Sequence, residues 1–180
     1  MSVTAGRGRV IVITGAIAAG KSTVAELLAA RLPRSVHVRG DVFRRMVVNG
    51  RADMTPNPSP EARAQLSLRY DLASQTADRY AAAGFDAVVQ DVILGRELPD
   101  FIDRITNPER FLVVLSPSLS TLEWRERHRS KAGYLHFSPD ALNAVLHTET
   151  EQLGYWLDSS AQTPEETVDD ILANLFRAAV

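Results

Sequence analysis

Residues 15–22 read Gly-Ala-Ile-Ala-Ala-Gly-Lys-Ser and match the pattern G-x-x-x-x-G-K-[ST] at every fixed position. Its two glycines permit a tight loop whose backbone N–H groups point toward one anion. In this pattern the lysine reaches the β- and γ-phosphates of a nucleotide, and the serine hydroxyl binds Mg²⁺. The residues expected to hold the phosphates are Gly15, Ala16, Ala18, Ala19, Gly20, Lys21, Ser22 and Thr23.

The surroundings of this loop support a phosphate-binding function. An apolar run at 10–14 is typical of a buried strand, and residues 23–30 have the composition of a helix. The alternative is a glycine-rich turn that merely joins a strand to a helix. A chance match of the four fixed positions is expected on the order of once in a hundred sequences of this length or less. The strand and helix around the motif favour the nucleotide site further.

Composition limits the kinds of partner that the chain can bind. With 180 residues and 45% apolar content, residues 1–180 are expected to form one domain. The net charge of −2 gives no basic field for a nucleic acid or a membrane surface, so the expected partner is a small molecule. The absence of cysteine excludes disulfides and thiolate metal sites. Residues 1–8 are expected to be a flexible arm, and the protein to be cytoplasmic.

Predicted strands and helices alternate along the rest of the chain. The strands are predicted at 10–14, 35–38, 87–90, 111–115 and 155–157. Further helices are predicted at 42–49, 60–84, 99–105, 120–131, 138–151 and from 163 onward, the fourth with a capping box of Ser120 and Glu123. The last of them is expected to bury one face formed by Val168, Ile171, Leu172, Leu175 and Phe176. This alternation predicts an α/β fold with a five-stranded parallel sheet flanked by helices on both faces, which binds ligands at the carboxyl ends of its strands.

Two aspartates are predicted to follow strands at that edge. Asp41 comes after the second strand, where a carboxylate can orient an attacking hydroxyl and accept its proton, although an aspartate before a helix also serves as an N-cap. Asp91 ends the third strand, where a carboxylate holds Mg²⁺ or its water. Asp91 is predicted to be a metal ligand together with Ser22, with acceptor binding as the alternative.

Residues 119–150 are predicted to form a helical lid and an adjoining helix. Arg125 and Arg129 are four residues apart and share one helix face. Guanidinium groups on a closing helix can neutralise the charge of a phosphoryl-transfer transition state, so both are predicted to be catalytic with Asp41 and Lys21. A solvated basic face is the alternative. The side chains predicted to line an acceptor pocket are Asp41, Arg44, Arg45, Met54, Tyr70, Asp91 and Ile93.

Together these segments resemble the chloramphenicol phosphotransferase-like family of small P-loop kinases. The resemblance rests on residues 15–22, Gly40-Asp41, residues 88–95, the pair Arg125 and Arg129, and His147 ahead of Trp156. It implies a P-loop NTPase fold of the nucleoside and shikimate kinase type, with ATP and Mg²⁺ as cofactors. It also implies transfer of the γ-phosphate to a hydroxyl of a small molecule, with Asp41 as the base and Lys21 as the P-loop lysine.

The predicted function is an ATP-dependent phosphotransferase whose acceptor is an antibiotic or a related natural product. A nucleoside, nucleotide or sugar-nucleotide kinase is an alternative, because the same fold serves these substrates. A non-catalytic ATP-binding switch is an alternative of another class. The sequence identifies neither the acceptor nor the oligomeric state.

Overall fold

The computed structural model describes residues 6–128 and 137–180. Its centre is one sheet of five parallel strands, in the order β2-β3-β1-β4-β5. The strands are β1 (Val10–Gly15), β2 (Ser35–Arg39), β3 (Asp86–Gln90), β4 (Arg110–Leu115) and β5 (Tyr155–Leu157). The five predicted strands and the parallel sheet are confirmed. Every residue of β1 is buried, because this strand has neighbours on both sides and helices on both faces.

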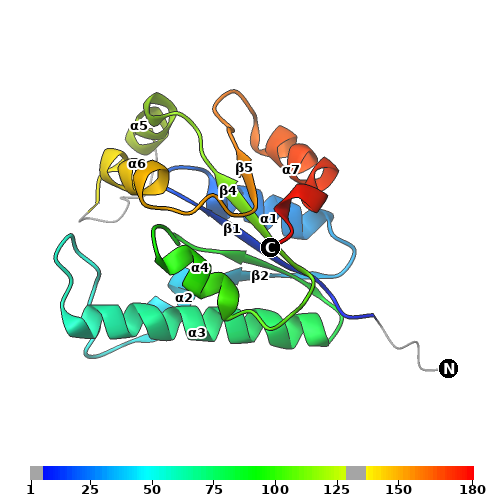
Figure 1. Ribbon diagram of the computed structural model, residues 1–180, viewed down its shortest axis with the longest axis horizontal. Helices are drawn as coiled ribbons and strands as arrows, with labels where there is room; N and C mark the ends of the chain where they lie inside the picture. The colour runs from blue at the N-terminus through cyan, green and yellow to red at the C-terminus, as the bar shows by residue number, and fades with distance from the viewer. Residues whose placement is uncertain (1–5, 129–136) are drawn as a thin grey trace.

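Helices cover both faces of the sheet, as Figure 1 shows. One layer contains α3 (Pro60–Ala82) and α4 (Glu97–Asp103), which pack on Val12, Val89 and Leu112. The other contains α1 (Lys21–Arg31) and α7 (Pro164–Ala173), which pack on Ile11, Ile13 and Val88. Successive residues of a strand therefore face different helix layers.

The remaining helices are short. Helix α2 (Gly40–Met46) follows β2 and contacts α3. Helices α5 (Leu119–Arg127) and α6 (Pro139–Thr148) contact each other. Figure 1 shows them near the carboxyl ends of the strands, on the side away from α2. A 3₁₀ helix, η1 (Leu175–Ala178), ends the chain beside β4 and β5. Among the residues that the structure describes, no helix has the length and apolarity to cross a membrane.

Several local predictions are wrong. The N-cap of α5 is Ser118, whose hydroxyl accepts from the Thr121 N–H, so the predicted capping box at Ser120 and Glu123 is not formed. Helix α2 ends at Met46 rather than Asn49, and its segment to Gly50 is a loop. In the last segment Leu172 and Phe176 are exposed: Leu172 is still within α7 but off the face that buries Val168 and Ile171, and Phe176 lies in the 3₁₀ turn after the α-helix has ended at Ala173.

Candidate active site

The loop between β1 and α1 has the curvature of an anion-binding turn. Gly15, Ala18 and Gly20 have φ values of 144°, 62° and 94°. Such conformations direct successive backbone N–H groups into one concavity, which favours a phosphate. Gly15 also lacks room for a side chain, because a Cβ there would lie 2.4 Å from the carbonyl oxygen of Leu115 on β4. Glycine is therefore required where the loop leaves the sheet.

Lys21 begins α1 and folds back over this loop. Its Nζ donates to the carbonyl oxygens of Gly15 at 2.9 Å and Ala16 at 2.6 Å, and the side chain is 6% exposed. The lysine charge and the positive end of the α1 dipole therefore lie at the same loop, where both favour an anion.

Ser22 faces the end of β3. Its Oγ donates to Oε1 of Gln90 at 3.3 Å, and Gln90 is 8% exposed. Gln90 lies in register with Ile13 of β1 and Arg39 of β2, which puts it between the ends of these two strands. Gln90 is not among the predicted site residues. Side chains alternate along β3, so Gln90 points to the same side of the sheet as Val88, which packs in the core with α1.

Asp91 pairs with Arg69 of α3. Arg69 Nε donates to Oδ2 at 2.7 Å, its second nitrogen contacts Oδ1, and the Val92 N–H donates to Oδ1 at 2.7 Å. Asp91 is 1% exposed and Arg69 is 8% exposed. Burial is the largest influence on the Asp91 pKa and raises it, whereas Arg69, the Val92 N–H and Lys21 oppose that rise. The metal role of Asp91 stays a prediction, and Ser22, its predicted partner, contacts Gln90 instead.

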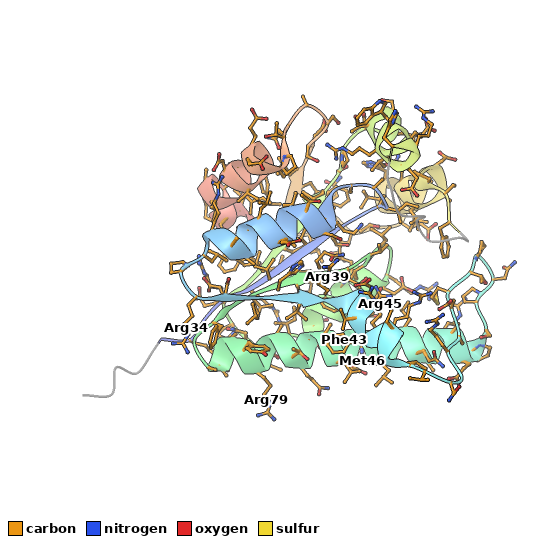
Figure 2. All side chains as sticks on the ribbon, turned by 180° about the vertical axis from the view of Figure 1, so that it is seen from behind. Arg34, Arg39, Phe43, Arg45, Met46 and Arg79 are labelled. Carbon is orange, nitrogen blue, oxygen red and sulfur yellow. The ribbon has the colours of Figure 1, made fainter. Side chains whose placement is uncertain are left out.

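Asp41 lies in the first turn of α2. It directly follows Gly40, whose backbone lies close to the Asp91 side chain. Arg39 is the N-cap of α2, so the interpretation of Asp41 as an N-cap is wrong. The Asp41 carboxylate is 35% exposed and pairs with Arg45 at 3.1 Å, one helical turn away. Figure 2 shows Arg45 on this short helix, with Phe43 and Met46 beside it near α3. An exposed carboxylate with one surface partner can turn to a substrate at small cost.

The other predicted acceptor residues lie in three places. Met54 and Tyr70 line a cavity of about 220 Å³ between α3 and α4, whose remaining walls are Arg63, Leu66, Ser67, Glu97, Asp100 and Arg104. Arg44 pairs with Asp53 at 2.7 Å on the loop after α2. Ile93 is fully buried in the core beside α3 and α4. Their roles in acceptor binding stay predictions.

Arg125 of α5 links the phosphate loop to the segment after β5. It donates to the carbonyl oxygens of Ala19 at 3.2 Å and Ser159 at 2.9 Å. Burial lowers the pKa of Arg125, and nearby Asp158 opposes this shift. Arg125 also lines a cavity of about 330 Å³ together with Ser120, Thr121, Trp124 and Ser160. Arg129, its predicted companion, lies outside the described residues.

Two further residues fix the position of the loop after β3. The Thr14 hydroxyl donates to the Ile93 carbonyl at 2.8 Å and accepts from the Ile93 N–H at 2.9 Å. Arg69 anchors Asp91 in the same loop. The sequence analysis missed both, because neither belongs to a local motif.

The site offers few protein ligands for a metal. No group of three or more His, Cys, Asp or Glu side chains within residues 6–128 and 137–180 is arranged to hold an ion. The donors next to the phosphate loop are Ser22 Oγ and Gln90 Oε1. This sparse oxygen set fits Mg²⁺, which keeps several waters and takes its other ligands from substrate phosphates.

Comparison with known proteins identifies the fold. A family model described as an AAA domain matches residues 10–154. A sugar kinase from Janibacter sp. HTCC2649 superposes with a TM-score of 0.69 at 19% identity, covering 96% of both chains. The APS kinase of Mycobacterium tuberculosis, in complex with AMPPNP and APS, gives a TM-score of 0.68 at 19% identity, over 95% of this chain and 99% of that one.

A third similar structure is the Deinococcus radiodurans tunicamycin resistance protein. Its TM-score is 0.63 at 19% identity, over 93% of this chain and 95% of that one. A search of the curated proteins found no match. The predicted P-loop NTPase fold of the kinase type is confirmed.

Proposed function

We propose that this protein, which belongs to the AAA domain family, is an ATP-dependent kinase that phosphorylates a hydroxyl of a small molecule. The observation that carries the proposal is the arrangement at one sheet edge. The phosphate loop ends the central strand β1, and Asp41 follows β2 at the same edge, two strands away. Parallel α/β sheets bind ligands at this edge.

The phosphates bind to the loop of residues 15–20 and to the first turn of α1. The amides of Gly15, Ala16, Ala18, Ala19, Gly20 and Thr23 belong to this binding surface, together with Lys21. Lys21 exchanges its two carbonyl contacts for the β- and γ-phosphates. Ser22, at the start of α1, would hold Mg²⁺ on the protein side, and the metal would neutralise phosphate charge there.

The nucleotide base occupies the cavity beside Arg125. This cavity of about 330 Å³ is adjacent to the phosphate loop, because Arg125 contacts both Ala19 and Ser159. Trp124 contributes an aromatic surface and is 57% exposed. Arg125, with Arg129, closes over the transferring group and excludes water that would hydrolyse ATP.

Asp41 orients the acceptor hydroxyl and accepts its proton. Reaching the acceptor requires only that Asp41 leave the exposed Arg45 pair. The acceptor binds between α2, the loop after it and the cavity lined by Met54 and Tyr70. An antibiotic, a sugar or a related natural product is the proposed acceptor class, and the similar sugar kinase and tunicamycin resistance protein support this range.

The test replaces Asp41 by asparagine. Asp41→Asn keeps the size of the side chain but removes its basicity, so ADP release is expected to fall about 10² to 10⁴-fold with nucleotide affinity unchanged. Asp103→Asn, at an exposed position near the end of α4, is the matched control and should retain full turnover. Normal turnover of Asp41→Asn would remove Asp41 from the mechanism.

An acceptor panel separates the related functions. Phenicols, aminoglycosides, sugars, nucleosides and nucleotides are compared by acceptor-dependent ADP release. A response to nucleosides or nucleotides alone would replace the antibiotic or sugar class by the nucleotide kinase alternative. ATP binding without ADP release under any acceptor would favour the non-catalytic switch.

A further inference from the structure

Gln90, the last residue of β3, and Asp91, which follows it, face different layers of the protein. Val88 packs in the core formed with α1 and α7, whereas Val89 packs in the core formed with α3 and α4. Strand alternation then directs Gln90 toward α1 and Asp91 toward α3. The contacts agree, since Gln90 accepts from Ser22 of α1 and Asp91 accepts from Arg69 of α3.

Asp91 is held firmly on the α3 side. Both of its oxygens accept hydrogen bonds, and Gly40 lies so close that a Cβ there would be 1.9 Å from Oδ2. Turning Asp91 toward Ser22 would break its ion pair with Arg69, and breaking a buried ion pair is strongly unfavourable. The structure therefore favours a positioning function for Asp91.

Gln90 lies beside Ser22, the residue that the phosphate-binding pattern assigns to Mg²⁺. Its Oε1 is within hydrogen-bond distance of the Ser22 hydroxyl, and its register between the ends of β1 and β2 restricts its movement. An amide oxygen can accept from a metal-bound water or coordinate a hard cation, as a carboxylate does, but it adds no negative charge. A centre built with Gln90 must obtain its negative charge from the nucleotide.

We propose that Gln90, rather than Asp91, is the side chain of β3 that serves the magnesium–nucleotide centre. Gln90 orients the Ser22 hydroxyl and accepts a hydrogen bond from metal-bound water. Asp91 is a positioning residue that fixes Arg69 and the turn carrying Asp41. The metal consequently binds as its nucleotide complex and has little affinity for the free protein. This inference rests on the proposed function.

The test measures how far Mg²⁺ improves the binding of a non-hydrolysable ATP analogue. The analogue's Kd is determined by calorimetry in Mg²⁺ and in EDTA, and the ratio of the two values is the readout. Gln90→Leu should reduce this ratio about tenfold, because the loss of an outer-shell partner weakens metal binding by that order. Gln75→Leu, an identical change at an exposed position of α3, should leave it unchanged.

Two further variants test the inference: Gln90→Glu adds a charge beside Ser22, and Asp91→Asn removes the charge of Asp91. Glutamate adds a negative charge beside Ser22, so Mn²⁺ should bind the nucleotide-free variant more tightly than the wild-type protein, as measured by electron paramagnetic resonance. Asp91→Asn should keep the wild-type Mg²⁺ ratio while losing stability. If Asp91→Asn does not fold, the two Gln90 variants still decide the matter.

The outcomes are distinguishable. A wild-type ratio in Gln90→Leu would overturn the inference, as would a ratio lost in a folded Asp91→Asn and kept in Gln90→Leu. Tight Mn²⁺ binding by the nucleotide-free wild-type protein would also overturn it. Failure of the wild-type protein to bind the analogue in both conditions would overturn the proposed function, and this inference with it.

Discussion

Replacing Gly40 by alanine tests whether the Asp91 carboxylate fixes the turn that carries Asp41. The added Cβ would lie 1.9 Å from Asp91 Oδ2, 2.6 Å from its Cγ and 3.1 Å from its Cβ. Non-bonded carbon atoms prefer separations of about 3.5–4.0 Å, so one of the two residues must move by more than an ångström. Asp91 resists this movement because Arg69 and the Val92 N–H hold its oxygens.

The size of the effect depends on which residue moves. A shift of the turn before α2 corresponds to overpacking, with a loss of about 1–3 kcal/mol in the free energy of unfolding. Separation of Asp91 from Arg69 breaks a buried ion pair, with a loss of about 3–5 kcal/mol. Either movement displaces the helix start that contains Asp41, so acceptor KM should rise as well.

Urea unfolding at neutral pH measures the loss, and Gly6→Ala is the matched control. No atom lies within 4 Å of a Cβ at Gly6, so this variant should remain within about 0.5 kcal/mol of the wild-type protein. In an Asp91→Ala background, Gly40→Ala should be less harmful, because the carboxylate it meets is gone. Equal stability of Gly40→Ala and Gly6→Ala, or an unchanged loss in the Asp91→Ala background, would refute the reasoning.

Three other predictions concern different contacts. Thr14→Val should lower the free energy of unfolding in urea by about 1–3 kcal/mol, because it leaves the buried N–H and carbonyl of Ile93 without the Thr14 hydroxyl. Thr14→Ser retains the hydroxyl and is the control. Equal losses in both variants would contradict this account. Arg125→Met should weaken binding of the ATP analogue on the order of tenfold, because Arg125 holds Ala19 of the phosphate loop and Ser159 beside the cavity proposed for the base, and hydrogen bonds to a charged group contribute about 1.5–3 kcal/mol. An unchanged Kd by calorimetry would exclude Arg125 from the nucleotide site. The hydroxyl of Tyr155, followed by Gln162 and Asn174, holds the pKa of Asp170 below its ordinary value, so the stability that it contributes is present above about pH 4 and is lost as the pH falls through the folded-state pKa. Acid unfolding should therefore show a smaller pH dependence in Asp170→Asn than in the wild-type protein, and identical curves would count against this coupling.

Local patterns were sufficient for the elements and for the phosphate loop. The apolar run before Gly15 and the helix after Gly20 define a strand, a loop and a helix within about 20 residues, so neighbouring residues alone are enough to recognise them. The predicted start of the last helix at 163 is equally local, because the Thr163 hydroxyl accepts from the Glu166 N–H and the Glu166 carboxylate accepts from the Thr163 N–H. The cap at Ser118 was missed because Ser120, two residues later, has the same chemistry.

Local patterns could not predict which distant residue a side chain contacts. Asp91 and Arg69 are 22 residues apart, and Ser22 and Gln90 are 68 apart. The sequence predicts that the Asp91 carboxylate lies at the end of a strand. Whether that carboxylate binds a metal or an arginine depends on which helix covers that face of the sheet. Counting alternation from Val88 would have separated Gln90 from Asp91 only once the packing of α1 and α3 was known.

The order of residues 15–22 and the alternation of apolar and helical segments by themselves determined the parallel sheet and the loop suited to phosphate, because backbone geometry and hydrophobic periodicity act over a few residues. Only the tertiary structure decided that Gln90 meets Ser22, that Arg69 holds Asp91 against Gly40, and that Arg125 lies on the phosphate loop. Burial in two separate helix layers is the physical reason. A buried polar or charged group in either layer must find its partner there, whatever the distance along the chain.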